Sequence, residues 1–313
     1  MNAPQLHSAF ARAVSEGLSA SPKRLSPKWL YDARGSALFE KITDLPEYYP
    51  TRTEIALLRE VAPQLAAGVG EGASVIEFGA GSAAKTPLLL AALAAPALYA
   101  PIDISTTYLE HSAAAIAERF PALKVRPILG DFTRLGELPA DIAARDGPRL
   151  GFFPGSTIGN LEPGAMMDFL RSARRYLGPG AQLIVGVDTP KARDILIPAY
   201  DDAEGVTAAF NLNLLERMKR ELGADLDVNA FHHEARWNEA LSRIEMHIVS
   251  DKKQIVDVGG MRFRFAPGES IHSESSHKIA PETFLARARE AGWVPDGLWL
   301  AQKGMFSIHR LRG

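Results

Sequence analysis

The chain has 313 residues, of which 46% are apolar and 23% charged, and its formal net charge is −2. This length allows one large domain or two medium ones with a full core, and the balanced charge disfavours a nucleic-acid partner held through its phosphates. The chain has no cysteine, which excludes disulfides, thiolate nucleophiles and cysteine-ligated zinc. Because we see no apolar run of about 18 residues and no signal-peptide pattern, we expect a cytoplasmic protein without a membrane partner.

The middle of the chain alternates short apolar runs with helical patterns. Strands are expected at residues 74–78, 97–102, 124–129, 149–154 and 182–187, and helices at 85–95, 107–120 and 162–177. This alternation predicts a parallel sheet covered by helices on both faces, with ligand-binding loops at the carboxyl ends of the strands.

The tail adds a helix and a pair of strands, expected at residues 281–291, 298–301 and 305–311. A terminal antiparallel pair on a parallel sheet suits a methyltransferase better than a dehydrogenase. Residues 55–189 and 279–313 are therefore expected to form a Rossmann-like, class I methyltransferase domain.

The remaining segments, residues 1–54 and 190–278, interrupt the alternation. The second contains a helical part at 200–222 and a β-like part at 235–265. We expect both segments to form one additional, α+β domain that packs over the sheet edge.

The most informative motif is the run from Val75 to Thr86, which reads as a buried strand, a glycine turn and the start of a helix. Such a turn presents backbone N–H groups and a helix N-terminus to a ligand. The spacing Glu77-x-Gly79-x-Gly81 also permits a dinucleotide. The acid before the first glycine favours S-adenosylmethionine instead, because the amino-acid part of that cofactor carries an ammonium group.

Acidic residues follow the next strands. Asp103 fits a ligand for the ribose hydroxyls or a helix N-cap. Asp131 fits an acceptor for the adenine amino group with Phe132 covering the ring, or a turn residue beside a core aromatic. Lys85 lies in the first turn of a helix, where a cation opposes the helix dipole. It therefore either pairs with a ligand carboxylate or is a solvated surface lysine.

The adjacent residues His232 and His233 raise the question of a metal site. Neighbouring side chains point apart on regular structure, and no third ligand is evident in the sequence. We therefore expect no metal.

Long runs carry a resemblance to a known family. They are KWLYDARGS (residues 28–36), LPEYYPTRTE (45–54), GSTIGNL (155–161), AYDDAEGVTAAFNLN (199–213), IEM (244–246) and FAPGE (265–269). Together they resemble the histidine Nα-methyltransferases of ergothioneine biosynthesis, over nearly the whole chain. The resemblance implies trimethylation of the α-amino group of L-histidine to hercynine, through the mono- and dimethyl forms, with S-adenosylmethionine as the methyl donor.

The resemblance implies that residues 1–54 and 190–278 build the substrate-binding domain, and it also implies a role for individual residues. The cofactor-binding positions are Gly79, Lys85, Asp103, Asp131 and Phe132. The substrate carboxylate is assigned to Asn160 and Tyr200, a backbone contact to Gly155, the imidazole to Tyr48, Glu274 and Ser276 with Met246 beside it, and the amino group to the aromatics Tyr31 and Phe39. A catalytic role is expected for Tyr31 and Phe39, as residues that orient the amine and disfavour its protonated form.

Each of these residues also has a structural interpretation. Glu274 reads alone as a surface acid, Asn160 as a turn residue, Met246 and Tyr200 as core residues, and Tyr48 as a loop anchor. The family tends to show Thr-Glu-Val-Ser-x-Lys-Phe near the imidazole, whereas this chain has Ser273-Glu-Ser-Ser-His-Lys-Ile279. This departure keeps the alternatives open of a methyltransferase for another amino acid, such as tryptophan or tyrosine, or of a non-catalytic cofactor-binding scaffold. We expect a monomer, since no self-complementary apolar patch is legible.

Overall fold

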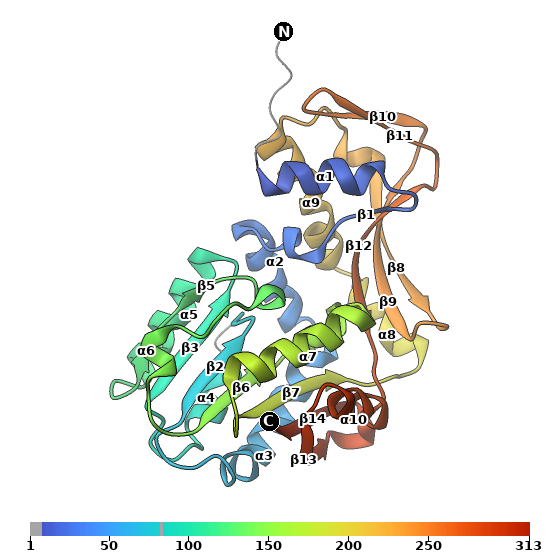
Figure 1. The fold of residues 1–313 in the computed structure, drawn as a ribbon. Coiled ribbons are helices and arrows are strands. Elements are labelled where there is room, and N and C mark those ends of the chain that lie inside the picture. The colour runs from blue at the N-terminus through green and yellow to red at the C-terminus, as the bar shows by residue number, and fades with distance from the viewer. Residues whose placement is uncertain (1–7, 82–83) are drawn as a thin grey trace. The chain divides into compact units, whose positions relative to one another are not determined.

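The computed structural model describes residues 8–81 and 84–313, and the chain divides into two compact units. The α+β unit comprises the described residues up to Tyr48 and Ala192–His277, and the Rossmann-like unit comprises Tyr49–Lys191 and Lys278–Gly313 (Figure 1). These divisions lie within a few residues of the expected ones. The largest difference is at the first, because the helix that begins at Tyr49 belongs to the Rossmann-like unit.

The Rossmann-like unit is built on one mixed sheet with the strand order β13-β14-β7-β6-β2-β3-β4, and β5 also pairs with β3. Its strands are β2 (Ser74–Phe78), β3 (Leu98–Asp103), β4 (Lys124–Val125), β5 (Ile128–Leu129), β6 (Arg149–Phe153), β7 (Gln182–Asp188), β13 (Val294–Leu300) and β14 (Phe306–Arg312). Strands β2 to β7 are parallel, whereas β14 is antiparallel to β7 and to β13. The class I methyltransferase sheet with terminal antiparallel strands is therefore confirmed.

Helices cover both faces of this sheet. They are α3 (Tyr49–Ala66), α4 (Thr86–Leu90), α5 (Thr106–Arg119), α6 (Ala140–Ala143), α7 (Pro163–Leu177) and α10 (Pro281–Glu290), with the short 3₁₀ helices η2 (Phe132–Arg134), η3 (Thr157–Asn160) and η5 (Gln302–Gly304). The neighbours Val75 and Ile76 of β2 enter different hydrophobic cores, with Leu58 of α3 in one and Phe169 of α7 in the other. A strand buried on both faces explains why these runs are continuously apolar.

Two expected elements of this unit are shorter than predicted. The helix expected at 85–95 is only α4, because the chain turns after Leu90 and Ala95 adopts a φ of 43° immediately before Pro96. The strand expected at 124–129 is divided into β4 and β5 on either side of Pro127, which has no N–H for the ladder.

The α+β unit contains a four-stranded sheet in the order β1-β12-β9-β8 and a separate β10-β11 hairpin. Its elements are α1 (Ala9–Ser19), β1 (Lys23–Arg24), η1 (Pro27–Leu30), α2 (Ala33–Asp44), α8 (Arg193–Tyr200), α9 (Val206–Leu222), η4 (Val228–Ala230), β8 (Phe231–Asn238), β9 (Arg243–Ser250), β10 (Gln254–Val258), β11 (Met261–Phe265) and β12 (Ser270–His277). Strands from the insertion and from the N-terminal segment therefore share one sheet, since β1 pairs with β12.

The helical part expected at 200–222 is interrupted, because α8 ends at Tyr200 and α9 begins at Val206. Gly205 has a φ of 73°, and the carboxylate of Asp202 accepts hydrogen bonds from the N–H groups of Val206 and Thr207 at 2.9 and 2.7 Å. The strand β12 was not predicted at all, although it carries Glu274 and Ser276. Ile271 is its only aliphatic residue, so it lacks the apolar alternation that marks a strand.

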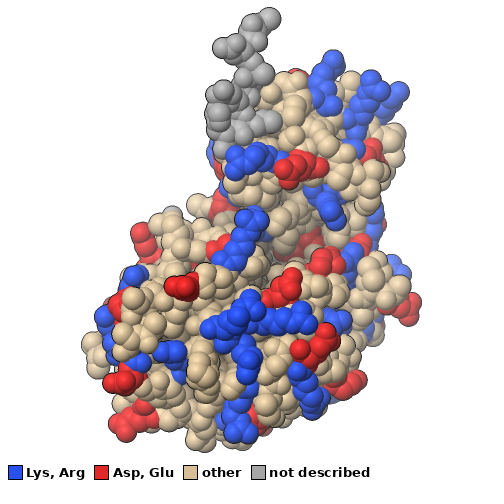
Figure 2. Space-filling view, in the orientation of Figure 1, with Lys and Arg blue, Asp and Glu red and all other residues tan. Residues whose placement is uncertain are grey.

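The charged side chains of both units are mixed in sign. On the face shown in Figure 2, Lys and Arg side chains lie among Asp and Glu side chains, consistent with the net charge of −2. Within residues 8–81 and 84–313, no helix is both long enough and apolar enough to span a bilayer.

Candidate active site

The glycine turn follows β2 as expected. Gly79 adopts a φ of 71°, and a Cβ built there would lie 3.4 Å from the ring of Phe132. The absence of a side chain therefore lets the turn approach the loop after β5 closely. The other part of the motif, Ser82 and Ala83, lies outside the described residues.

Asp103 and Asp131 end neighbouring strands or loops of the same sheet edge, and each also makes a local contact. Asp103 Oδ1 accepts from the N–H of Ser105 at 2.9 Å, and Asp131 Oδ1 accepts from the N–H of Thr133 at 3.0 Å. Burial raises the pKa of Asp103, although the N–H of Ser105 opposes the shift. Both local contacts leave carboxylate capacity for ribose or adenine donors, since an ionised carboxylate accepts about four hydrogen bonds.

Phe132 is fixed by other aromatic rings. Its ring centroid lies 5.2 Å from that of Phe153 and 5.9 Å from that of Phe169, both in edge-to-face geometry. The ring that is expected to cover an adenine is thus held in place by the core rather than by the loop.

Lys85 is neither a solvated lysine nor unpaired. Its Nζ lies 2.6 Å from Oε2 of Glu54, a carboxylate whose side chain is 1% exposed. The same carboxylate accepts the backbone N–H of Gly155 at 2.8 Å, and a Cβ at Gly186 would lie 2.1 Å from Glu54 Oε1. One buried acid therefore joins α3 to the loops after β2 and β6, and it engages the Gly155 N–H that was considered for the substrate.

Glu77, the acid before the glycine turn, is directed into the sheet. Its Oε2 accepts from the hydroxyls of Thr86 and Tyr99 at 2.7 and 2.6 Å. Burial raises the pKa of Glu77 to about 7, although these hydroxyls and the charge of Lys85 oppose the shift. Its observed contacts are therefore structural ones within the turn and the neighbouring strand.

A second buried ionic cluster lies at the carboxyl end of β7. Asp188 accepts from the hydroxyl of Tyr49 at 2.6 Å and pairs with Lys191 at 2.5 Å and Lys278 at 2.8 Å. Burial would raise the pKa of Asp188, but the charges of Lys278 and Lys191 outweigh it and hold the pKa below its ordinary value.

Asn160 is the last residue of η3, in the loop after β6. The turn begins with Gly155 at a φ of 81° and Ser156 at a φ of 55°, and the Ser156 hydroxyl accepts from the N–H of Asp188 at 2.9 Å. Asn160 is half-buried, so its amide is presented from a loop tied to the end of β7.

In the α+β unit, the predicted aromatic residues form one group. Tyr31 and Phe39 have ring centroids 5.5 Å apart, Phe39 and Tyr48 are 6.2 Å apart, and Tyr48 and Tyr200 are 6.0 Å apart. Phe210 of α9 lies beside the first two, at 5.4 and 6.0 Å. Residues from the end of η1, α2, the loop before α3, α8 and α9 are thereby brought into contact.

The group continues onto strand β12. Tyr200 and Ser276 share a hydrogen bond of 2.9 Å between their hydroxyls, and both residues are buried. Glu274 lies two residues before Ser276 on the same strand face, is 7% exposed, and is the register partner of Met246 on β9. Glu274 is therefore a buried acid beside the predicted residues, and its interpretation as a surface acid is wrong.

A network of buried polar side chains contacts the backbone of Tyr200 and the β-bulge before Glu274. His233 Nε2 donates to the carbonyl of Tyr200 at 2.8 Å, and its Nδ1 accepts from the amide of Asn211 at 2.8 Å. Asn211 Oδ1 in turn accepts from the hydroxyl of Ser273 at 2.6 Å, at the β-bulge before Glu274. Burial lowers the pKa of His233, although the Tyr200 carbonyl opposes the shift, so this imidazole is neutral.

His232, by contrast, points away from His233 and contacts Asp251 at 2.5 Å. The two histidines of this run therefore do not share one ligand, as expected from their adjacency.

Comparison with known proteins identifies the family. Residues 10–313 match a family model described as "Histidine-specific methyltransferase, SAM-dependent". The chain is 42% identical over 306 residues to the histidine N-alpha-methyltransferase of Mycolicibacterium smegmatis, with 96% of this chain and 94% of that protein covered. The chain belongs to the histidine-specific, S-adenosylmethionine-dependent methyltransferases.

Two further relatives differ in their similarity to this chain. The histidine N-alpha-methyltransferase of Mycobacterium tuberculosis is 41% identical over 308 residues, covering 96% of this chain and 94% of that protein. The 4-dimethylallyltryptophan N-methyltransferase of Trichophyton verrucosum is 28% identical over 261 residues, covering 79% of this chain and 76% of that protein.

Sequence reasoning missed several residues of this histidine-specific methyltransferase. Asn211 and Glu54 both lie inside runs that carry the family resemblance, so the signal was present but no role was attached to it. Asp188 ends a predicted strand at the ligand-binding edge, which could have marked it. His233 had no such signal, because its partner Asn211 is distant in sequence.

Proposed function

We propose that this protein transfers methyl groups from S-adenosylmethionine to the α-amino nitrogen of L-histidine in three successive steps, giving hercynine for ergothioneine biosynthesis. The observation that carries the proposal is the 2.9 Å hydrogen bond between Tyr200 and Ser276, with Glu274 buried on the same strand face. It joins the residue expected to hold the substrate carboxylate to those expected to hold the imidazole.

The residues of the Rossmann-like unit fit the methyl donor. The turn at Gly79, where φ is 71°, lies beside the ring of Phe132, and Asp103 and Asp131 lie at the ends of the neighbouring strands β3 and β5. When bound, S-adenosylmethionine supplies an electrophilic methyl group. The protein's share of the reaction is then mainly to position the two reactants, an effect that can lower the barrier by roughly 7–11 kcal/mol.

The proposed roles in the α+β unit follow from donor and acceptor chemistry. Glu274 accepts a hydrogen bond from the N–H of the imidazole, and the Ser276 hydroxyl donates to the other ring nitrogen. Each hydroxyl has one hydrogen, so on substrate binding Tyr200 and Ser276 exchange their mutual hydrogen bond for bonds to the carboxylate and the imidazole. A side chain without these nitrogens leaves a buried acid without its ligand, which can reduce the reaction by about 10⁴-fold. Tyr31 and Phe39 surround the amine with aromatic rings, which disfavours the charged, non-nucleophilic form and tolerates the quaternary product.

The departure from the family pattern lies away from these residues. Ser275 and His277 are register partners of Glu245 and Arg243, on the sheet face opposite Glu274, and Ile279 belongs to a core of the Rossmann-like unit. The altered side chains therefore do not form part of the Glu274 and Ser276 face. This supports histidine over the alternative of another amino acid.

A substrate panel tests the proposal. The protein is incubated with S-adenosylmethionine and L-histidine, its mono- and dimethyl forms, L-tryptophan or L-tyrosine, and products are measured by mass spectrometry. We expect trimethylhistidine and negligible product from the other amino acids. Faster methylation of tryptophan or tyrosine would establish the alternative substrate, and cofactor binding without turnover would establish a scaffold.

A further inference from the structure

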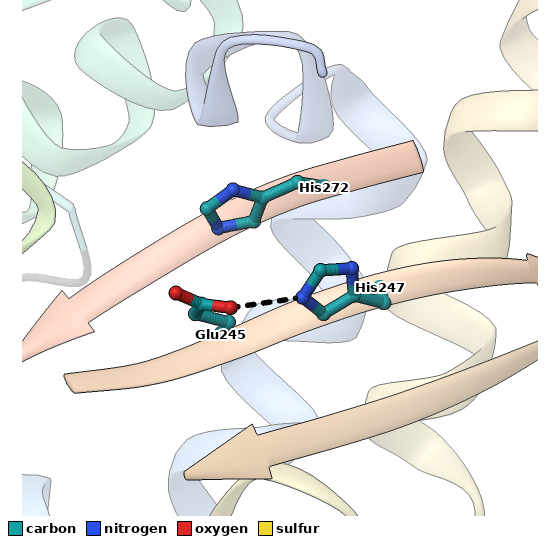
Figure 3. Close-up of side chains that lie close together, drawn as sticks. All are labelled: Glu245, His247 and His272. Atoms are coloured by element: carbon teal, nitrogen blue, oxygen red, sulfur yellow. Dashed lines mark hydrogen bonds and ion pairs between the residues drawn. The ribbon is translucent and has the colours of Figure 1, made fainter. Parts of the chain in front are cut away.

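A cluster of potential metal ligands lies on the face of the α+β sheet opposite Glu274. Glu245 and His247 are two residues apart on β9, and His272 on β12 is the register partner of His247. One ligand atom from each residue lies within 4.8 Å of the others, and Figure 3 shows the three side chains gathered on one side of the strand pair. Both strands belong to one antiparallel ladder, which holds the positions rigidly.

Glu245 and His247 are oriented by neighbouring side chains. Glu245 Oε1 accepts from Arg243 at 2.7 Å and from Asn238 at 3.0 Å, and His247 Nδ1 contacts the Ser270 hydroxyl at 3.0 Å. The other atom of each group, Oε2 and Nε2, therefore faces its neighbour at 3.1 Å (Figure 3). Metal-binding histidines are held in this way, with the second ring nitrogen bonded to a protein group.

His272 completes the set with a ring that can turn. It stacks on His247 with centroids 4.9 Å apart and an angle of 15°, and its Nε2 lies 3.0 Å from the Ser275 hydroxyl and from the carbonyl of Glu274. The terminal torsion of histidine is soft, so a modest rotation brings Nε2 toward the other two ligand atoms. That rotation exchanges the contact with the Glu274 carbonyl for a contact to an ion.

The charge of the cluster allows a cation. Arg243 pairs with Glu245, and Arg236 pairs with Glu234 at 2.6 Å, so the arginine charges are balanced. The side chains of Glu245 and His247 are 13% and 10% exposed, so an ion bound between them is largely shielded from solvent.

We propose that Glu245, His247 and His272 bind one divalent transition-metal ion of the zinc class through a carboxylate oxygen and two imidazole nitrogens, with water at the remaining positions. Imidazole and carboxylate ligands suit zinc, cobalt and nickel rather than magnesium or calcium. The site is separate from the residues assigned to histidine. It borders them at His272, whose ring contacts the carbonyl of Glu274, and at Met246, which lies between Glu245 and His247 on β9.

The binding test does not depend on methylation. Tag-free protein, stripped with a chelator, is titrated with Co²⁺ by visible absorption and with Zn²⁺ by calorimetry. We expect one ion per chain, and a loss of affinity of about tenfold or more in His247→Ala and in Glu245→Gln. The matched control is His232→Ala, which removes an exposed histidine of the same sheet and leaves the affinity unchanged.

His272→Gln is the second ligand variant, because His272 is more exposed than His247 and its loss disturbs packing less. An absence of stoichiometric binding overturns the proposal, as does equal loss of affinity in the His232 and His272 variants. If the proposed function also holds, Zn²⁺ raises the KM for L-histidine in the parent protein and not in His272→Gln. A binding result without turnover of histidine would contradict the function and leave the metal site standing.

Discussion

The two units use their predicted residues in different ways. In the Rossmann-like unit, Gly79, Asp103 and Asp131 lie at or just beyond the carboxyl ends of strands, so their placement follows from the backbone of a parallel sheet. In the α+β unit, the residues assigned to the substrate come from separate segments and meet only through side-chain contacts, such as Tyr200 with Ser276. The cofactor half of such an enzyme can thus be predicted from pattern, whereas the substrate half depends on long-range packing.

The largest effect is expected for Glu274, in the α+β unit. We expect Glu274→Gln to lower kcat/KM for L-histidine by roughly 10²- to 10³-fold, because an amide cannot replace a buried, charge-assisted acceptor. Binding of S-adenosylhomocysteine, measured by calorimetry, should not change. The exposed acid Glu239 provides the control variant Glu239→Gln, and a parallel loss of cofactor affinity in Glu274→Gln would contradict the separation of roles.

Replacing Glu77 tests whether this acid, next to the glycine turn, has a structural role. Because its native pKa is raised from 4.5 to about 7, the native state binds more protons than the unfolded chain in this range. The stability contributed by Glu77 therefore decreases as the pH rises from 4.5 to 7. We measure the free energy of unfolding of Glu77→Gln and of the parent in urea. The value for Glu77→Gln minus that for the parent should increase by up to about 3 kcal/mol between pH 5 and pH 8.

The control for this measurement is Glu71→Gln, which changes an exposed acid near the start of the same strand. Its stability relative to the parent should not vary with pH. A Glu77→Gln difference that is equal at pH 5 and pH 8 would show that this acid is ionised in both states.

Replacing Asp103 tests its predicted role in cofactor binding. We expect Asp103→Asn to weaken S-adenosylhomocysteine binding by about 10- to 100-fold, since hydrogen bonds to a charged acceptor contribute about 1.5–3 kcal/mol. Calorimetry measures this effect, and Asp146→Asn, at an exposed loop acid, serves as the control. Unchanged cofactor affinity would mean that Asp103 only supports its own turn through Ser105.

The smallest effect is expected for the network behind Tyr200. His233→Ala removes the donor to the Tyr200 carbonyl and leaves Asn211 with one partner fewer, so we expect the KM for L-histidine to rise about tenfold. His232→Ala, at the adjacent exposed position, is the matched control. A change in stability without a change in KM would assign His233 to folding alone.

The Rossmann-like unit could be predicted from the sequence more fully than the α+β unit. Strand β2 was predicted to the residue, because five consecutive buried positions leave a clear apolar signal. Strand β12 was missed, because its buried positions other than Ile271 are serines, a histidine and a glutamate, and the burial of such residues depends on partners such as Asn211 and Tyr200. The predicted substrate residues of this unit were found only through family resemblance, and Asn211 and His233 were not found because their roles arise from hydrogen bonds across the fold.

The contacts of the Glu54 carboxylate limit the substitutions that this protein can tolerate. It simultaneously pairs with Lys85, accepts from Gly155 and fills the space above Gly186. Changing the acid leaves a largely buried ammonium without its counter-charge, and enlarging the glycine displaces the acid. Substitutions at these positions are therefore strongly non-additive, so accessible evolutionary paths must alter them together or leave all of them unchanged.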